Sequence, residues 1–189
     1  MKPWYCLPIL LLTPLTAFAN DYPQLKSGLW KVQTTIDGKG DAAIKQCINE
    51  DTFKRLLESG AQMMGGACSE LQMTKEGGTY RSNINCTIAG SKMVSTGTMS
   101  GDFQTSYTAV TKTTTTPPLM GMGNSTQTST ANYLGECEAG MKPGDIITAD
   151  GKKMNVLSMM DSMPKNMGEM MKNMPDMSKL GEQLQNMPQ

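Results

Sequence analysis

Hydrophobic and polar residues alternate over much of this chain, which is the pattern of half-buried strands. In residues 28–36 the alternation places one set on one face, namely Trp30, Val32, Thr34 and Ile36, and a second set on the other, namely Leu29, Lys31, Gln33 and Thr35. Turn residues separate similar segments, so we expect a mainly β fold: one antiparallel curved sheet, or an up-and-down barrel-like domain, of about seven strands. The further expected strands are 43–48, a segment after Ser69, 80–88, 92–100, 103–115 and 125–134.

One short helix is expected between the second and third of these strands. Asn49 suits the N-cap, Phe53 and Leu57 recur at helical spacing, and Gly60 suits the end of the helix. A loop is expected at 117–124, where prolines and glycines gather. The sequence thus predicts a single helix within an otherwise β domain.

Hydroxyl side chains crowd two of the expected strands, 103–115 and 125–134. Threonine is β-branched and favours strands, and its hydroxyl tolerates water. We therefore expect solvated strand faces, with the polar lumen of a barrel as the alternative. The threonines concerned are Thr111, Thr113, Thr114, Thr115, Thr116, Thr126, Thr128 and Thr130.

Residues 1–19 have the three parts of a secretory signal peptide. Lys2 supplies the positive charge, an apolar run follows, and small residues at Ala17 and Ala19 predict cleavage before Asn20. The run is too short, and too interrupted by Pro14, to span a bilayer. We expect an exported, periplasmic protein with no membrane span.

The cysteines after the signal form an even set, Cys47, Cys68, Cys86 and Cys137. In an exported chain an even set predicts two disulfides, and the sequence does not choose among the three pairings. We favour Cys47–Cys68, which would close a helical loop, with Cys86–Cys137. Because the chain has no histidine and no C-x-x-C motif, a zinc site is not expected.

Charge and residue chemistry narrow the function classes. The chain has 17 basic and 17 acidic residues, so it shows no electrostatic footprint for nucleic acid. The absence of histidine removes the commonest general base and the usual partner of a serine or cysteine nucleophile. We therefore expect a protein that is not an enzyme.

Short motifs in a fixed order give the chain a family resemblance. They are Gly28-Leu29-Trp30, Cys47-Ile48-Asn49-Glu50-Asp51, Asn85-Cys86, Gly97-Thr98-Met99-Ser100-Gly101-Asp102 and Ala131-Asn132-Tyr133-Leu134-Gly135-Glu136-Cys137. Over about residues 25–140 the chain resembles a family of exported bacterial proteins known as domain of unknown function 3617. The resemblance implies a β-rich fold and a Gram-negative envelope location, and it implies no activity.

The domain is expected to span residues 20–150, and residues 151–189 are expected to form a methionine-rich, flexible or partly helical tail. Pro164 and Pro175 would interrupt a single long helix. The tail could rest on its own domain or on another protein, scavenge oxidants, or bind Cu(I) or Ag(I), for which thioethers are suitable ligands. The candidate metal ligands are Met167, Met170, Met171, Met174 and Met177.

Two functional hypotheses follow. The first is a non-enzymatic module that binds a small apolar ligand or an envelope protein on a concave apolar face. Trp30, Tyr80 and Tyr107 are its candidate ligand-binding residues, and plain core packing is their alternative role. The second is soft-metal buffering through the tail; no other cofactor is expected.

Overall fold

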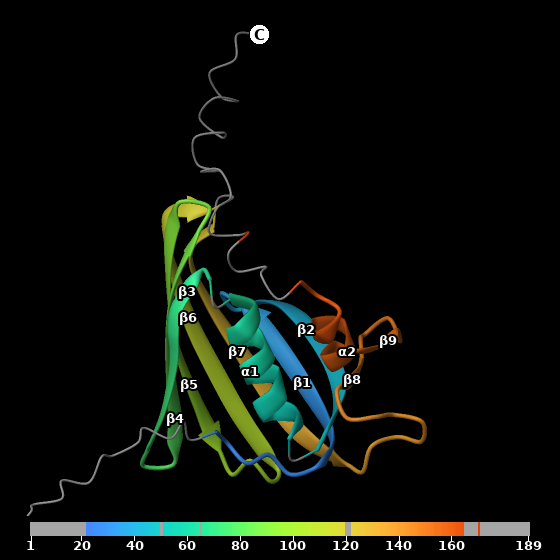
Figure 1. Ribbon diagram of the computed structural model, residues 1–189. Helices are drawn as coiled ribbons and strands as arrows, with labels where there is room; N and C mark the ends of the chain where they lie inside the picture. The colour runs from blue at the N-terminus through green and yellow to red at the C-terminus, as the bar shows by residue number, and fades with distance from the viewer. Residues whose placement is uncertain (1–21, 50, 65, 120–121, 165–169, 171–189) are drawn as a thin grey trace, which may run out of the picture.

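The computed structural model describes residues 22–49, 51–64, 66–119, 122–164 and 170. These residues form one open antiparallel sheet and two short helices (Figure 1), which confirms the mainly β prediction. The helices are α1 (Thr52–Met64) and α2 (Val156–Asp161). The strands are β1 (Gly28–Ile36), β2 (Lys39–Ile48), β3 (Cys68–Glu76), β4 (Thr79–Ile88), β5 (Ser91–Gly101), β6 (Ser106–Leu119), β7 (Met122–Gly135), β8 (Asp145–Ile147) and β9 (Lys153–Asn155).

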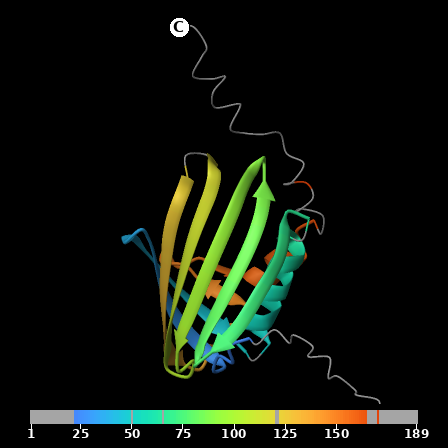
Figure 2. The ribbon, with the colours of Figure 1, turned by 90° about the vertical axis from the view of Figure 1, so that its left-hand side faces the viewer.

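The strands follow the order β3-β4-β5-β6-β7-β1-β2-β8-β9 across the sheet. Strands β3 to β7 form a meander whose long members stand side by side as a wall (Figure 2). The sheet curves around α1, which lies on its concave side (Figure 1). We call the end at the β3–β4 and β5–β6 connections the base, and the end at the β4–β5 and β6–β7 connections the rim.

The strand register decides which side chains face α1. Cys86 lies opposite Met93, and Met93 lies opposite Thr115, so these three side chains share the concave face. At the base, Tyr107 lies opposite Ala131 of β7, which lies opposite Val32 of β1. Residues between these positions point to the convex face, because successive side chains of a strand alternate.

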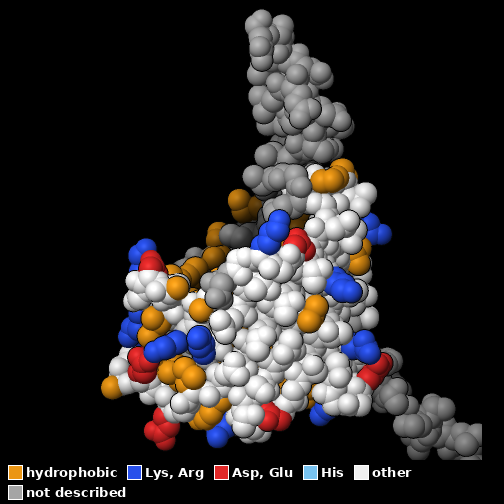
Figure 3. All heavy atoms as spheres, turned by 180° about the vertical axis from the view of Figure 1, so that it is seen from behind, with side chains coloured by type: hydrophobic (Ala, Val, Ile, Leu, Met, Phe, Trp, Pro, Cys, Tyr) orange, Lys and Arg blue, Asp and Glu red, His pale blue; other side chains and the backbone are white. Residues whose placement is uncertain are grey.

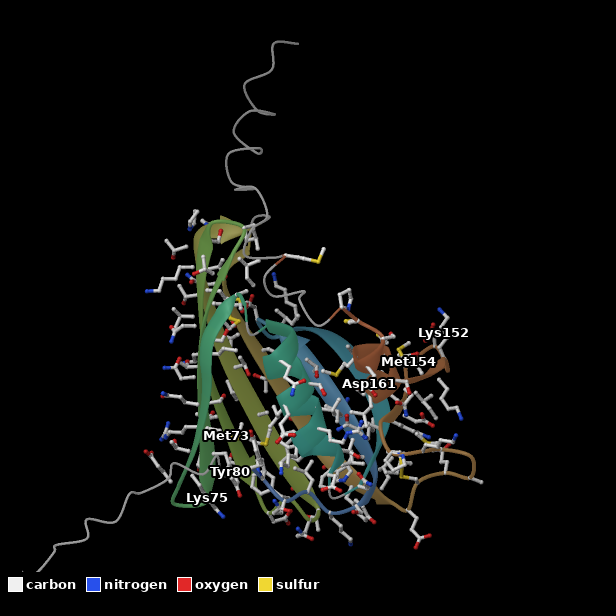
Figure 4. The ribbon with its side chains drawn as sticks, viewed as in Figure 1. Met73, Lys75, Tyr80, Lys152, Met154 and Asp161 are labelled. Atoms are coloured by element: carbon white, nitrogen blue, oxygen red, sulfur yellow. A yellow bond between two sulfur atoms is a disulfide. The ribbon has the colours of Figure 1, made fainter. Side chains whose placement is uncertain are left out.

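The hydrophobic core fills the concave face at the base. Trp30, Tyr80, Phe103 and Tyr107 are buried there, and Phe53 of α1 packs against them. The ring centroids of Trp30 and Tyr107 are 5.5 Å apart, and those of Tyr80 and Phe103 are 5.3 Å apart. Figure 4 places Tyr80 and Met73 at this end of the sheet. Trp30 and Val32 are buried on one face as the alternation predicts, but Ile36 on that face is 54% exposed and Leu29 on the other face is buried.

The disulfides are Cys47–Cys137 and Cys68–Cys86, so the favoured pairing of Cys47 with Cys68 and of Cys86 with Cys137 is wrong. The sheet order explains this difference. Strand β1 lies between β2 and β7, and Leu29 is opposite both Cys47 and Gly135. Cys137 follows Gly135 closely and therefore meets Cys47, while Cys68 and Cys86 are direct partners in the β3–β4 ladder.

Two local predictions also need correction. The helix begins at Thr52 and continues through Gly60 to Met64, and the side chain of Asn49 bonds to the hydroxyl of Thr52. The loop expected at 117–124 is largely strand, because β6 runs to Leu119 and β7 begins at Met122. These differences lengthen both the helix and the wall.

The domain extends beyond residue 150, where the sequence places its end. Asn155 caps α2 by accepting a hydrogen bond from the backbone N–H of Ser158 at 2.9 Å, and it donates to Asp145 at 2.8 Å. Leu157 is buried, with only 7% of its surface exposed. Met154 and Asp161 lie in this folded segment (Figure 4).

Two predicted segments fall outside the described residues, namely the signal peptide at 1–19 and most of the tail after Pro164. Among the described residues, no helix is long and apolar enough to cross a membrane.

Candidate functional site

The structure brings the predicted ligand-binding residues Trp30, Tyr80 and Tyr107 together, but inside the core. Their exposed fractions are 0%, 6% and 7%. Burial raises the pKa of the Tyr107 phenol, and a hydrogen bond with Gln46 partly opposes this shift. The rings therefore fill the core role that the sequence also allowed, and ligand contact by them stays a prediction.

Toward the rim, the concave face changes from aromatic to small hydroxyl side chains. The hydroxyls of Ser95 and Thr113 lie 2.8 Å apart across β5 and β6. Gly97 leaves room for its neighbour, because an added Cβ would lie 2.3 Å from Oγ of Ser82. Ser82, Ser95 and Thr113 are all partly exposed. Large side chains therefore do not fill the concave wall near the rim as they do at the base.

The threonines that the sequence places on solvated faces divide between the two sides of the sheet. By register, Thr111, Thr113 and Thr115 lie on the concave face, and the others lie on the convex face. From behind, the surface is largely polar and uncharged, with separate lysine and arginine side chains (Figure 3). The solvated-face prediction therefore fits the convex face, while Thr113 and Thr115 on the concave face line a hollow.

This hollow lies at the rim and has a volume of about 220 Å³. It is formed where β4 ends, β5 begins, and β6 and β7 approach their connection. Among the described residues, its lining combines apolar and hydroxyl side chains and holds no charged one. We call it the rim hollow; its residues are Ile88, Ser91, Met93, Thr113, Thr115, Leu119 and Ser125.

Ser91 is the unusual member of the rim hollow. Only 1% of the residue is exposed, and its Oγ has no hydrogen-bond partner among the described residues. Such groups are rare in folded proteins, because an unpaired buried hydroxyl costs about 1–3 kcal/mol. In the sequence Ser91 is simply the end of the Ala89-Gly90-Ser91 turn, so no sequence signal points to it.

Two carboxylates with a lowered pKa, those of Asp102 and Asp145, accept hydrogen bonds from backbone N–H groups of loops. Three backbone N–H groups, those of Gln104, Thr105 and Ser106, donate to Asp102. Together with the Thr105 hydroxyl, which is the largest cause, they hold the pKa of Asp102 far below its usual range. The backbone N–H of Lys142 likewise lowers the pKa of Asp145. Both carboxylates stabilise turns and lie outside the rim hollow.

Soft-metal binding by the tail stays a prediction. Met170 is described and is 58% exposed, while Met167, Met171, Met174 and Met177 lie outside the described residues. Within the described ranges, no group of three histidine, cysteine or acidic side chains is placed to hold a metal ion.

Comparison with known proteins gives one result. Residues 25–137 match the family described as protein of unknown function (DUF3617). No curated protein and no solved structure matches the chain. The matched region contains both disulfides and every residue that lines the rim hollow. The chain therefore belongs to the DUF3617 family, as its motifs suggest.

Proposed function

We propose that this protein is a non-enzymatic binding module that takes a small, uncharged, mostly apolar group into the rim hollow. The observation that carries the proposal is the buried hydroxyl of Ser91, which has no partner among the described residues and lines an apolar hollow. The hydroxyl is inaccessible as it stands, and a turn of the Ser91 side chain toward the hollow would let a bound molecule with one hydrogen-bonding group pair with it.

The lining sets the chemistry of the ligand. Ile88, Met93 and Leu119 offer apolar contact, and no described residue of the lining carries a charge that could pair with an ionised group. Binding an ion there would remove it from water without compensation. An apolar cavity of about 150 Å³ is large enough for benzene, so about 220 Å³ suits an aromatic ring or a short alkyl chain. Few but well-placed polar groups are typical of small-molecule sites.

The same lining supports binding rather than catalysis. The hollow contains hydroxyl groups, but none of its seven lining residues carries a titratable group that could act as a general base at neutral pH. A serine or threonine hydroxyl needs an adjacent base to become a nucleophile. The proposed module therefore holds its ligand unchanged.

The proposal includes export to the periplasm. Disulfides persist in oxidising compartments, and the chain carries two of them. The signal pattern at residues 1–19 supplies the route. Intact mass of the protein purified from a cell-envelope fraction tests this part, since the proposal requires a mature chain that begins at Asn20. A full-length chain in the cytoplasmic fraction would contradict it.

The binding test uses N-phenyl-1-naphthylamine, an uncharged fluorophore that brightens in apolar surroundings. It is titrated into the mature protein and into Thr115→Phe, which places a ring in the hollow, with Thr114→Phe on the convex face as the matched control. We expect at least tenfold weaker binding for Thr115→Phe and unchanged binding for Thr114→Phe.

The proposal is overturned if the two variants bind the fluorophore with equal affinity. It is also overturned if the fluorophore binds neither to the wild type nor to the variants with an altered C-terminal segment that are described below. Thermal melting shows whether each variant is folded. Should Thr115→Phe fail to fold, Ser125→Leu fills the same hollow from β7 and takes its place.

A further inference from the structure

The C-terminal segment, residues 171–189, has a pattern of apolar residues that the packing of the described domain does not explain. Within residues 171–189, five apolar residues follow one another at steps of three, three, four and three. This spacing would place the last four of them on one side of a helix that begins at Pro175, where the first turn accepts a proline, with the first directly before it. The residues are Met174, Met177, Leu180, Leu184 and Met187. An apolar row of this kind favours burial against a partner surface.

The described structure places α2, the last helix before this segment, on α1, which leads toward the rim hollow. Helix α2 packs on α1, where Asp161 lies 3.8 Å from the guanidinium of Arg55 and Met160 approaches Gly60. At the far end of α1, the carbonyl of Ala67 accepts a hydrogen bond from the backbone N–H of Thr87 at 2.7 Å. Thr87 precedes Ile88 of the rim hollow, so α1 connects the two places.

The chain is long enough to reach the hollow. Helix α1 has 13 residues and is therefore about 20 Å long. From Pro164 the remaining residues 165–189 can extend over about 80 Å. Tethering gives a short segment an effective concentration of about 1 mM, so even a contact of weak intrinsic affinity is populated.

The chemistry of the segment fits the lining. The hollow presents Met93 and Leu119 without a charged neighbour, and unbranched methionine side chains adapt well to irregular apolar surfaces. In residues 171–189 the basic Lys172 and Lys179 are matched by Asp176 and Glu182, so the side-chain charges balance.

We propose that residues 171–189 dock in the rim hollow through their apolar row when no ligand is bound, so that ligand and C-terminal segment compete for one site. The inference rests on the proposed function, because it requires the rim hollow to bind an apolar group. Under this proposal, the affinity for ligand depends on the sequence of residues 171–189 as well as on the residues that line the rim hollow.

The test compares two double variants of the full mature chain that introduce the same side chain. Met174→Gln with Met177→Gln removes two members of the apolar row, while Asn173→Gln with Ser178→Gln changes neighbouring positions outside it. We expect the methionine variant to bind N-phenyl-1-naphthylamine at least threefold more tightly than the wild type. The control variant should bind as the wild type does.

Methionine methyl NMR gives a second readout without any ligand. The methyl signal of Met93, which lines the rim hollow, should differ between the wild type and the methionine variant. The signal of Met73, which is buried in the core cluster at the base, should not differ. A synthetic peptide of residues 171–189 should return the Met93 signal of the methionine variant toward its wild-type position.

The outcomes separate the two proposals. If wild type and methionine variant bind the fluorophore equally and share one Met93 signal, the docking of residues 171–189 is refuted while the rim hollow remains a binding site. If neither protein binds the fluorophore and Thr115→Phe changes nothing, the binding function itself fails.

Discussion

Replacing Ser91 by alanine should stabilise the free protein, although most substitutions of buried residues destabilise. The Ser91 hydroxyl is buried and unpaired among the described residues, so the native state carries its desolvation cost without a compensating bond. Ser91→Ala removes the hydroxyl and keeps the Cβ. It therefore deletes no hydrogen bond of the described structure and opens a space of only one atom.

Ser95→Ala is the matched comparison, on the same strand and the same face. Its hydroxyl is paired with that of Thr113 at 2.8 Å, and this bond is lost in the variant. A hydrogen bond contributes about 0.5–1.5 kcal/mol to stability, whereas an unpaired buried hydroxyl costs about 1–3 kcal/mol. We therefore expect Ser91→Ala to raise the free energy of unfolding by about 1 kcal/mol and Ser95→Ala to lower it by about 1 kcal/mol.

Urea unfolding followed by tryptophan fluorescence measures both changes. A protein prepared from Asn20 onward has a single tryptophan, Trp30, which is fully buried and so reports loss of the core. Equal slopes against urea concentration would show that the variants alter stability and not the extent of unfolding. If Ser91→Ala destabilises as much as Ser95→Ala, the hydroxyl of Ser91 has a partner in the native protein and the reasoning fails.

Three further predictions follow from the fold. Removing the Cys47–Cys137 disulfide should lower the free energy of unfolding more than removing Cys68–Cys86, because the two bonds close loops with sequence separations of 90 and 18. Loop entropy then gives a stabilisation of about 4.6 kcal/mol for the first bond and about 3.2 kcal/mol for the second. Urea unfolding of the two double-alanine variants tests this order. Deleting residues 152–189 should lower the melting temperature strongly because it removes the buried Leu157, whereas deleting 165–189 removes only the docking segment and should lower it less; equal loss in both would contradict the packing of α2. Asp102→Asn should lower the melting temperature at neutral pH and make the melting temperature less dependent on pH below about 4. The reason is that a carboxylate with a lowered pKa stabilises the folded state above its unfolded-state pKa near 3.9, and this stabilisation is lost as the pH falls. A variant whose melting temperature depends on pH as that of the wild type does would contradict this prediction.

Alternation along the chain was enough to predict the fold class, because burial of one sheet face imposes a period of two on each strand. It placed Trp30 and Val32 correctly on the face that became the core. The disulfide pairing depended on something the pattern does not contain, namely that β1 inserts between β7 and β2. Strand neighbours are set by tertiary packing, so spacing between cysteines could not identify Cys137 as the partner of Cys47.

The candidate site was less predictable than the fold. The large aromatic residues attract attention in a sequence, but they fill the base as core, while the hollow is made by small residues such as Ser91 and Thr115. Its location depends on how the register brings Met93, Thr115 and Ser125 to one face of three strands. The sequence favours Gly60 as a helix end, but in the structure it lies within α1, where an added Cβ would meet Met160 of α2 at an ordinary contact distance of 4.0 Å.

The binding claim is best decided by the methyl signal of Met93 during titration with N-phenyl-1-naphthylamine. The account predicts that this signal shifts progressively and saturates, while the signal of Met73 at the base stays in place. The Thr115→Phe variant should show neither shift. A saturating titration that moves Met73 and leaves Met93 unchanged would place the ligand in the aromatic core and contradict the assignment of the rim hollow as the binding site.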